Sequence, residues 1–219
     1  MVHALFVDPQ APEGLELIEI AQQRGIPVQA TTPAALAEMC DTVNPQGALA
    51  VCGQMDVEPD DLPPHAKLVL VCARMRDPGN AGAVLRCADA FGADAVVVTA
   101  DSVDLYNPKV VRASVGSLFH LPLILGVELD MILGDLRERG MQILAAEGSG
   151  TELVNDLAAD GTLAAPTAWI MGNEAWGLPP EDSVLADRSV AVPIHGRAES
   201  LNLATAAAVC LYASATAQS

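Results

Sequence analysis

Three separated segments place polar side chains beside glycines, where a backbone can approach a ligand closely. The first, residues 77–98 (DPGNAGAVLRCADAFGADAVVV), follows the apolar run LVLVCA and contains Asn80 and Arg86. Its Gly79-Asn80 turn is expected to open a helix whose free N–H groups can bind an anion, and Gly82 permits close backbone approach. Asn80 and Arg86 lie six residues apart, so they share a helix face poorly unless Asn80 lies outside the helix. A strand-to-helix turn with a solvated arginine explains the same pattern.

The second segment, residues 168–179 (AWIMGNEAWGLP), is a strand that runs into a glycine turn. Asn173 and Glu174 follow the strand's carboxyl end, where open α/β sheets bind ligands. An ordinary tight turn does not need both polar residues and the two glycines at 172 and 177, which favours a site. Trp176 is expected to be buried in the core rather than to stack on a substrate.

The third segment, residues 192–213 (VPIHGRAESLNLATAAAVCLYA), runs from a strand through a loop into a helix. Ser200 can be the N-cap of that helix or a catalytic residue, and Asn202 follows it closely. The helix is rich in small apolar residues on most of its surface. It is therefore expected to be buried against another element or another subunit.

Short β-branched runs alternate with helical patterns from residue 67 onward, which predicts an α/β fold with a mostly parallel sheet. The expected strands are residues 67–73, 95–99, 141–146, 168–171 and 190–194. The expected helices are residues 81–91, 107–117, 129–139 and 203–215.

A smaller α/β unit precedes this domain. Strands are expected at residues 3–8, 27–30 and 47–52, with helices at 15–23 and 33–39. The acidic, proline-rich stretch MDVEPDDLPPHA disfavours both helix and sheet and is a natural linker. The predicted domains are therefore residues 1–59 and 60–219, with the boundary near Asp60.

The formal net charge of −17 argues against nonspecific affinity for polyanions. Residues 67–112 nevertheless hold six of the eleven basic residues and five acidic ones. This concentration indicates a less acidic face, although solvated surface charges explain it equally well.

Cysteine and histidine usage argues against metal chemistry. The five cysteines form no C-x-x-C motif and lie in apolar surroundings, so they are expected to be reduced core thiols. The four histidines are scattered, and no metal site is expected. The sequence contains no long apolar run and no signal-peptide pattern at its start, which predicts a cytoplasmic protein without membrane attachment.

Taken in order, the three segments resemble the characteristic motifs of the SpoU/TrmH family of RNA 2′-O-ribose methyltransferases. The intervening residues 107–123 (NPKVVRASVGSLFHLPL) are similar to a further family segment, so the resemblance covers residues 67–213. Residues 36–51 (LAEMCDTVNPQGALAV) are similar to the end of the family's ribosomal-protein-like RNA-recruiting domain. The N-terminal unit, which looks like a shortened version of that domain, therefore has an uncertain recruiting role.

The resemblance implies a parallel α/β domain with a C-terminal trefoil knot, a homodimer, and S-adenosylmethionine (S-adenosyl-L-methionine) as cofactor. Sequence patterns alone would argue against a knot, because knots are rare. The residues that the resemblance places around the cofactor are Leu144, Ala145, Ala146, Glu147, Gly148, Ile170, Met171, Gly172, Asn173, Val192, Pro193, Ile194, Leu201 and Asn202.

The residues that match the family's catalytic set are Asn80, Arg86, Glu174, Ser200 and Asn202, while Lys109 and Arg112 are candidates for RNA phosphate contact. The implied reaction is methylation of a ribose 2′-hydroxyl in ribosomal or transfer RNA. The family's arginine is often assigned as the base, but a guanidinium stays protonated in proteins. Arg86 is therefore expected to hold the ribose-phosphate and stabilise the developing alkoxide, which leaves the proton acceptor open.

Two other functions remain compatible with the sequence. The net charge and the N-terminal unit also fit a family member that binds the cofactor without methylating RNA productively. A nucleotide-binding α/β protein of unrelated chemistry is a third alternative. The full set of five catalytic matches favours the active methyltransferase.

Overall fold

The computed structural model describes residues 1–40, 42 and 44–219. These residues form two compact units, Met1–Met55 and Asp56–Ser219. The division lies a few residues before Asp60, where the sequence analysis placed it. Each unit is described by itself.

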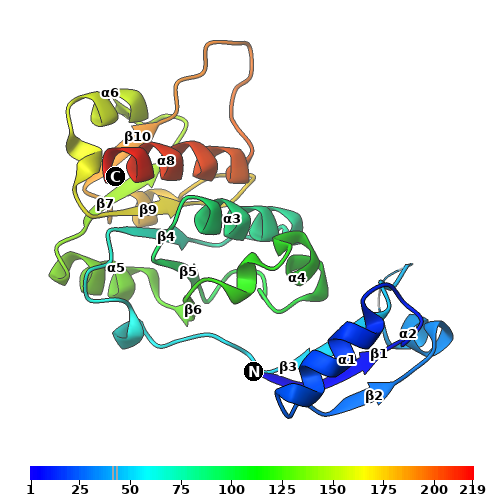
Figure 1. Cartoon of the computed structure of the whole chain (residues 1–219). Helices are drawn as coiled ribbons and strands as arrows, with labels where there is room; N and C mark the ends of the chain where they lie inside the picture. Colours follow the sequence, from blue (N-terminus) through cyan, green and yellow to red (C-terminus); the bar gives the residue numbers. More distant parts are fainter. Residues whose placement is uncertain (41, 43) are drawn as a thin grey trace. The chain divides into compact units, whose positions relative to one another are not determined.

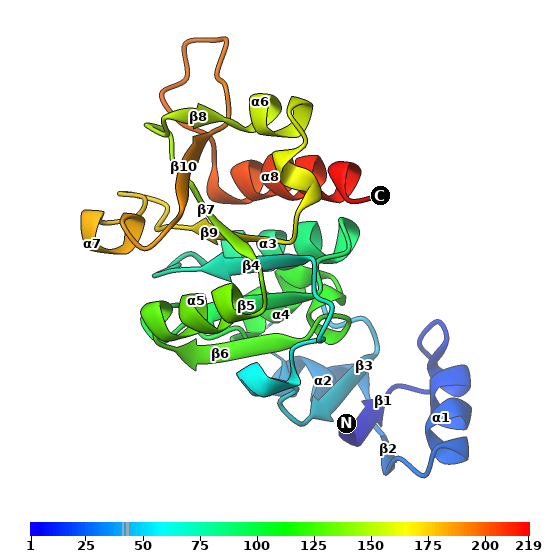
Figure 2. The same cartoon turned by 90° about the vertical axis from the view of Figure 1, so that its left-hand side faces the viewer.

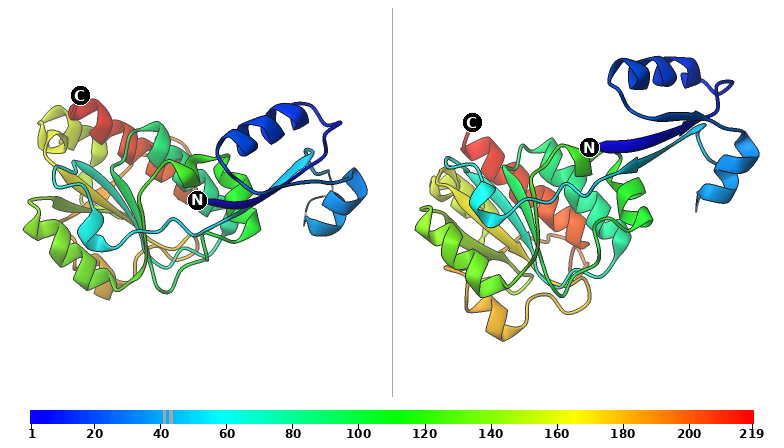
Figure 3. Two further views of the ribbon diagram at one scale, coloured as in Figure 1. Left: turned by 60° about the horizontal axis from the view of Figure 1, so that its bottom comes forward. Right: turned by 90° about the horizontal axis from the view of Figure 1, so that it is seen from below.

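The N-terminal unit is a small three-stranded sheet with two helices. Strand β1 (Val2–Val7) lies in the centre, parallel to β2 (Val28–Ala30) and antiparallel to β3 (Ala48–Cys52). Helix α1 (Gly14–Gln23) runs along one side of the sheet (Figure 3). Helix α2 (Pro33–Met39) begins after Thr32, whose hydroxyl accepts a hydrogen bond from the Ala35 N–H at 3.2 Å.

The larger unit is built on a seven-stranded sheet in which every pairing is parallel (Figures 1 and 2). The strand order is β6-β5-β4-β9-β7-β10-β8. The strands are β4 (Leu68–Cys72), β5 (Ala95–Thr99), β6 (Leu123–Val127), β7 (Gln142–Ala146), β8 (Glu152–Leu153), β9 (Thr167–Met171) and β10 (Arg188–Ala191). The predicted α/β class is confirmed.

Helices cover both faces of this sheet, as its fully apolar strands require. Leu68, Leu70 and Cys72 of β4 face one core, which contains α3 (Pro78–Ala90) and α8 (Leu203–Ala217). Val69 and Val71 face the other core, which contains α5 (Leu129–Glu138). Helix α4 (Pro108–Ser114) lies against α3 on the first side (Figure 1).

Several short elements were not predicted. Strand β8 and the helices α6 (Val154–Ala159) and α7 (Pro180–Ser183) are too short to give a clear period. Strand β6 contains Gly126 with a positive φ of 70°, and a glycine inside a strand weakens its pattern. The helix expected over residues 107–117 ends at Ser114, because Val115 and Gly116 adopt positive φ angles of 50° and 94°. The strand expected over residues 190–194 ends at Ala191, two residues before Pro193, which has no N–H to donate to a sheet.

Four neighbouring strands, β4, β9, β7 and β10, have their carboxyl ends at the same edge of the sheet, because all are parallel. After β10 a long loop projects from the unit (Figure 2), and α8 then returns across β4, β9 and β7 to lie beside α3. The return of the chain brings the third sequence segment to the first. The trefoil knot implied by the resemblance stays a prediction.

The cysteine prediction is partly confirmed. All five thiols are free; Cys72 and Cys210 are buried in the core, and burial raises the pKa of each to about 12. Cys52 is exposed on the edge strand β3, so the expectation of a core position was wrong for this residue. Within the described residues, no helix is long and apolar enough to cross a membrane.

Candidate functional site

A cavity of about 370 Å³ lies where β7, β9 and β10 end and α8 begins. This volume is within the range of small-molecule sites in proteins. The lining residues are Ala146, Glu147, Gly148, Ser149, Met171, Gly172, Asn173, Glu174, Ala175, Trp176, Gly177, Leu178, Val190, Val192, Ile194, Ser200, Leu201, Leu203 and Ala206. The second and third sequence segments therefore form most of its wall, and the end of β7 and Val190 of β10 supply the rest.

The first and third segments meet at a pair of asparagines. The Asn202 side-chain Nδ2 donates a hydrogen bond of 2.8 Å to Oδ1 of Asn80. Asn202 is also the N-cap of α8, because its Oδ1 accepts from the Ala204 N–H at 2.9 Å. The alternative that Ser200 caps this helix was wrong, and Ser200 is instead exposed at the cavity wall.

The first and second segments meet at Glu174. Its two carboxylate oxygens accept hydrogen bonds from the backbone N–H groups of Arg76 and Asp77, at 3.2 and 3.1 Å. Asp77 is the N-cap of α3 and accepts from the Asn80 N–H at 2.7 Å. The chain's own carboxylates thus occupy amides at this helix start, where negative charge is favourable. The expectation of free N–H groups for an external anion was wrong for the N–H of Asn80, because Asp77 already accepts its hydrogen bond.

The turn between Gly172 and Leu178 is held in one conformation by several hydrogen bonds. Asn173 and Gly177 exchange two backbone hydrogen bonds of 2.8 and 2.9 Å, and Gly177 has a positive φ of 72°. The Asn173 side chain accepts from the Ala175 N–H and donates to the Arg74 carbonyl oxygen, at 2.8 and 2.9 Å. A Cβ on Gly172 would lie 2.3 Å from the Gly177 carbonyl carbon, so this position requires glycine.

Trp176 lies on this turn and does not reach the core. It is 62% exposed, whereas Trp169 of β9 is fully buried and donates to Ser214 Oγ at 2.9 Å. The expectation that Trp176 is a core residue was therefore wrong. The reason is the tight turn, which directs the chain away from the sheet before it returns at Leu178.

Glu147 connects the end of β7 to two other elements. One of its carboxylate oxygens, Oε2, accepts hydrogen bonds from Ser183 of α7 and Ser189 of β10. Its other oxygen makes no hydrogen bond with a described residue. Glu147 therefore fixes the wall of the cavity and keeps an acceptor for a ligand.

Nine of the residues expected around the cofactor line this cavity: Ala146, Glu147, Gly148, Met171, Gly172, Asn173, Val192, Ile194 and Leu201. Five others do not line it, namely Leu144, Ala145, Ile170, Pro193 and Asn202; the first three are fully buried in their strands. Lining residues that the sequence analysis missed include Ser149, Trp176, Leu178, Leu203 and Ala206. The spacing of Leu203 and Ala206, three residues apart on α8, was a usable signal for one shared helix face.

Arg86 lies apart from the other four candidate catalytic residues. Asn80 is inside α3, so the six-residue spacing does not place both side chains on one face. Arg86 is exposed, does not line the cavity, and forms no hydrogen bond or ion pair with another described residue. The neighbouring Gly82 serves helix packing, because a Cβ there would lie 2.4 Å from Cβ of Ala113.

The basic residues between 67 and 112 do not share one face. Lys67 and Arg74 flank β4 at opposite ends. Lys109 and Arg112 are both exposed on α4, without an ion pair to a described residue. Lys109 and Arg112, the two expected RNA contacts, therefore lie three residues apart on one helix.

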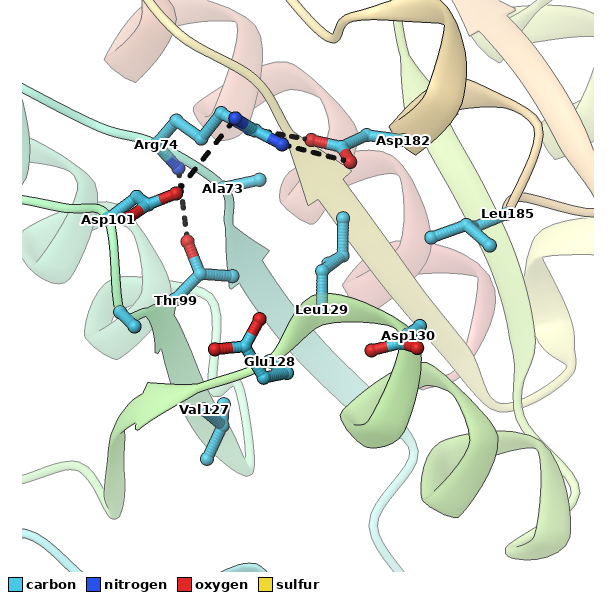
Figure 4. Close-up of a pocket in the computed structure, with 11 residues that line it drawn as sticks. Ala73, Arg74, Thr99, Asp101, Val127, Glu128, Leu129, Asp130, Asp182 and Leu185 are labelled. Carbon is cyan, nitrogen blue, oxygen red and sulfur yellow. Dashed lines mark hydrogen bonds and ion pairs between the residues drawn. The ribbon is translucent and has the colours of Figure 1, made fainter.

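A second, smaller cavity of about 140 Å³ lies at the ends of β4, β5 and β6 (Figure 4). Arg74 spans it, with hydrogen bonds from its Nε and Nη2 to Asp182 at 2.9 and 3.4 Å and an ion pair to Asp101 at 3.9 Å. The hydrogen bond to Asp182 raises the pKa of Arg74. None of the candidate catalytic residues lines this space. Arg74 thus holds the loop after β4 against α7.

Within the described residues, no group of three potential ligands is arranged to hold a metal ion.

Comparison with known families gives two matches. The model of the SpoU rRNA Methylase family matches residues 67–212. A second model, described as RNA 2′-O ribose methyltransferase substrate binding, matches residues 1–56. The two matches coincide with the two units of the structure.

Known proteins similar to the chain include methyltransferases of several bacteria. An uncharacterized tRNA/rRNA methyltransferase of Synechocystis sp. is 39% identical over 81% of this chain and 63% of its own length, which is less than two thirds. The 23S rRNA (guanosine(2553)-2′-O)-methyltransferase RlmP of Bacillus subtilis is 33% identical over 87% of this chain and 73% of its own. The crystal structure of the SpoU methyltransferase AviRb from Streptomyces viridochromogenes, in complex with the cofactor AdoMet, superposes with a TM-score of 0.86. It is 28% identical and covers 99% of this chain and 83% of that one.

Proposed function

Because the chain belongs to the SpoU rRNA methylase family, we propose that it transfers a methyl group from S-adenosylmethionine to a ribose 2′-hydroxyl of a structured RNA. The observation that carries this proposal is the hydrogen bond between Asn80 and Asn202. It joins the first and third sequence segments at the start of α8, while Glu174 joins the first and second. The polar groups of all three segments thus meet beside a cavity of suitable size.

The cavity fits the cofactor by its chemistry. Met171, Leu178, Val192 and Ile194 give it an apolar wall for a flat adenine, and Gly172 lies in the same wall. Glu147 brings a carboxylate oxygen for the hydroxyl or ammonium groups of the same molecule. When bound, S-adenosylmethionine supplies an electrophilic methyl group on a positively charged sulfur. The nine predicted residues that line the cavity would hold it.

Arg86 is proposed to act on the RNA rather than on the cofactor. Its free guanidinium, outside the cavity, can hold a ribose-phosphate bidentately and stabilise negative charge on the 2′-oxygen. Ser200 stands exposed at the cavity wall, where its hydroxyl can orient the ribose. Asn80, Glu174 and Asn202 are proposed to hold the start of α3 and the start of α8 together.

The proposed substrate is ribosomal or transfer RNA. Lys109 and Arg112 on α4 are proposed to contact phosphates. The N-terminal unit is proposed to recruit RNA, which its family match supports. Residues 1–55 contain one basic residue, Arg24, and six acidic residues, so this recruitment would not depend on a basic patch.

We further propose a homodimer. Helix α8 buries Ala207, Cys210 and Leu211 in its own core, so its apolar composition is explained within one subunit. The large side chains of Val115, Phe119 and Tyr212 nevertheless remain exposed on the side of the sheet that carries α3, α4 and α8. A molecular mass measured in solution by light scattering decides between monomer and dimer.

Two measurements on Arg86→Ala test the proposed reaction. Calorimetric titration with S-adenosylhomocysteine should give the wild-type affinity, because Arg86 does not line the cavity. Transfer of labelled methyl groups to purified total RNA should fall by roughly 10²-fold or more, because the lost contacts act in the transition state. The proposal fails if a folded wild-type protein gives neither cofactor heat at millimolar ligand nor transfer.

A further inference from the structure

Trp176 has the most exposed aromatic ring among the described residues. Aromatic residues make up 3% of the sequence, and Trp176 is one of two tryptophans. The other, Trp169, is buried and hydrogen-bonded, whereas Trp176 is 62% exposed. The exposed ring of Trp176 can therefore contact a ligand from solvent.

The backbone turn that carries the Trp176 side chain is held in one conformation by hydrogen bonds. The turn that carries it is closed by the paired backbone hydrogen bonds between Asn173 and Gly177. Glu174 fixes the same turn to the start of α3, and the Asn173 side chain fixes it to the loop after β4. A side chain with two rotatable bonds on a fixed turn loses little conformational entropy when it contacts a flat ligand.

Trp176 also lies near the residues that are proposed to act on the RNA. It lines the same 370 Å³ cavity as Ser200 and Leu201, which precede Asn202 and its contact with Asn80. Because the indole both lines the cavity and is largely exposed, it stands at the mouth.

The charge of the chain limits the other ways in which it can hold a nucleic acid. With a net charge of −17, the long-range electrostatics of the protein oppose binding of an RNA backbone. Stacking of a base on an aromatic ring needs no net charge and accepts any base. An exposed indole at the mouth therefore supplies an attraction that the electrostatics of the protein do not.

From these observations, and on the basis of the proposed RNA methylation, we propose that Trp176 is the stacking platform for a nucleobase of the RNA substrate. The base stacks on the indole at the mouth, and its ribose then faces the cavity wall at Ser200. Trp176 is a positioning residue in this arrangement. It acts mainly on the substrate's base, because its ring is largely exposed at the edge of the cavity.

Fluorescence tests the contact without requiring methyl transfer. Emission is measured in the full chain while fragmented, unmodified ribosomal RNA is added, with S-adenosylhomocysteine present or absent. RNA should quench the emission of Trp176 and protect it from iodide. The Trp176→Phe variant retains only the buried Trp169, so its emission should hardly change. If the quenching instead follows S-adenosylhomocysteine and not RNA, the indole belongs to the cofactor's adenine and the proposal is overturned.

A substitution series then distinguishes base stacking on an aromatic ring from an apolar contact that any hydrophobic side chain could make. Trp176→Ala and Trp176→Leu should raise the KM for RNA between about fivefold and 100-fold, the range that loss of one base–aromatic contact gives. Trp176→Phe, which keeps a stacking ring, should stay within about threefold of wild type. Because Trp176 also lines the cavity, the affinity for S-adenosylhomocysteine is measured for all three variants. It should change by a smaller factor than the KM for RNA, and binding of this ligand shows that the variants fold.

Two results of this series overturn the proposal: a KM for Trp176→Ala within twofold of wild type, or a Leu variant as good as Phe. Failure of the stacking proposal can be distinguished from failure of the proposed RNA methylation. Quenching by RNA without any methyl transfer would contradict the reaction but keep the stacking site. Methyl transfer that is unchanged in Trp176→Ala would keep the reaction and remove the site.

Discussion

The Asn202 side chain does two things at once: it caps α8 through Oδ1 and donates through Nδ2 to Asn80, a residue 122 positions earlier. The start of α8 and the start of α3 are therefore held by a single side chain. Loss of the contact should misalign the RNA-facing groups of both helices without unfolding either.

A double-mutant cycle tests this coupling. Asn202→Ser keeps a good N-cap but is too short to reach Asn80, so its free energy of unfolding should stay within about 1 kcal/mol of wild type. Asn80→Ala and Asn202→Ser should each lower kcat/KM. The double variant should be hardly worse than the more severe single variant, with a coupling of about 0.5–3 kcal/mol. Strictly additive losses would show that the two asparagines act independently.

Glu174 should contribute to stability as well as to the site. Glu174→Gln replaces one acceptor oxygen with a donor, so one of the N–H groups of Arg76 and Asp77 loses its partner. Urea denaturation should show a loss of about 1–2 kcal/mol. Glu181→Gln makes the same chemical change at an exposed position of α7 and should cost about 0.5 kcal/mol or less. Equal effects of the two substitutions would argue that Glu174 does not hold this loop.

RNA binding should depend only weakly on salt. Lys109→Glu or Arg112→Glu should weaken binding, whereas Lys67→Glu, at the opposite end of β4 from Arg74, should have little effect. Added salt weakens direct phosphate contacts but also screens the repulsion from a net charge of −17, so the two trends partly cancel. A steep fall in affinity, as for six or more phosphate contacts, would show that the local patch dominates over net charge.

The thiols should react in the order of their exposure. At pH 8 the exposed Cys52 should react rapidly with Ellman's reagent, since the thiolate is the reactive form and solvent reaches it. Burial raises the pKa of Cys72 and Cys210 to about 12, so these two should react only after denaturation. Mass spectrometry of the labelled peptides gives the order. Early labelling of Cys210 would mean that α8 opens readily.

The sequence predicted the sheet and the three chemical segments because each depends on local patterns. Apolar runs such as residues 68–72 predict buried parallel strands, and polar residues after them predict a ligand-binding edge. The sequence analysis offered Ser200 as the N-cap of α8, and no local pattern showed that Asn202 takes this position, since both side chains suit it. The contact with Asn80 selects Asn202, and this contact exists only after α8 has returned beside α3.

The same limit applies to Trp176 and to the anion site expected at α3. A tryptophan is usually expected in the core of a protein. The hydrogen bonds of Asn173 fix the turn that carries Trp176, and in this turn its side chain stays exposed. The amides at the start of α3 are used by Glu174, which lies 97 and 98 positions away from its two donors. No local pattern encodes pairings at such distances.

The most direct test of the account is to map ribose-methylated nucleotides in ribosomal and transfer RNA from cells with and without this gene. We predict that one or more 2′-O-methylated nucleotides disappear when the gene is deleted. Wild-type protein should restore them, and Arg86→Ala should not, although it still binds S-adenosylhomocysteine. If every methylated ribose persists in the deletion strain, and the purified protein transfers no methyl group to its RNA, the proposed reaction is contradicted, and the chain is a cofactor-binding module.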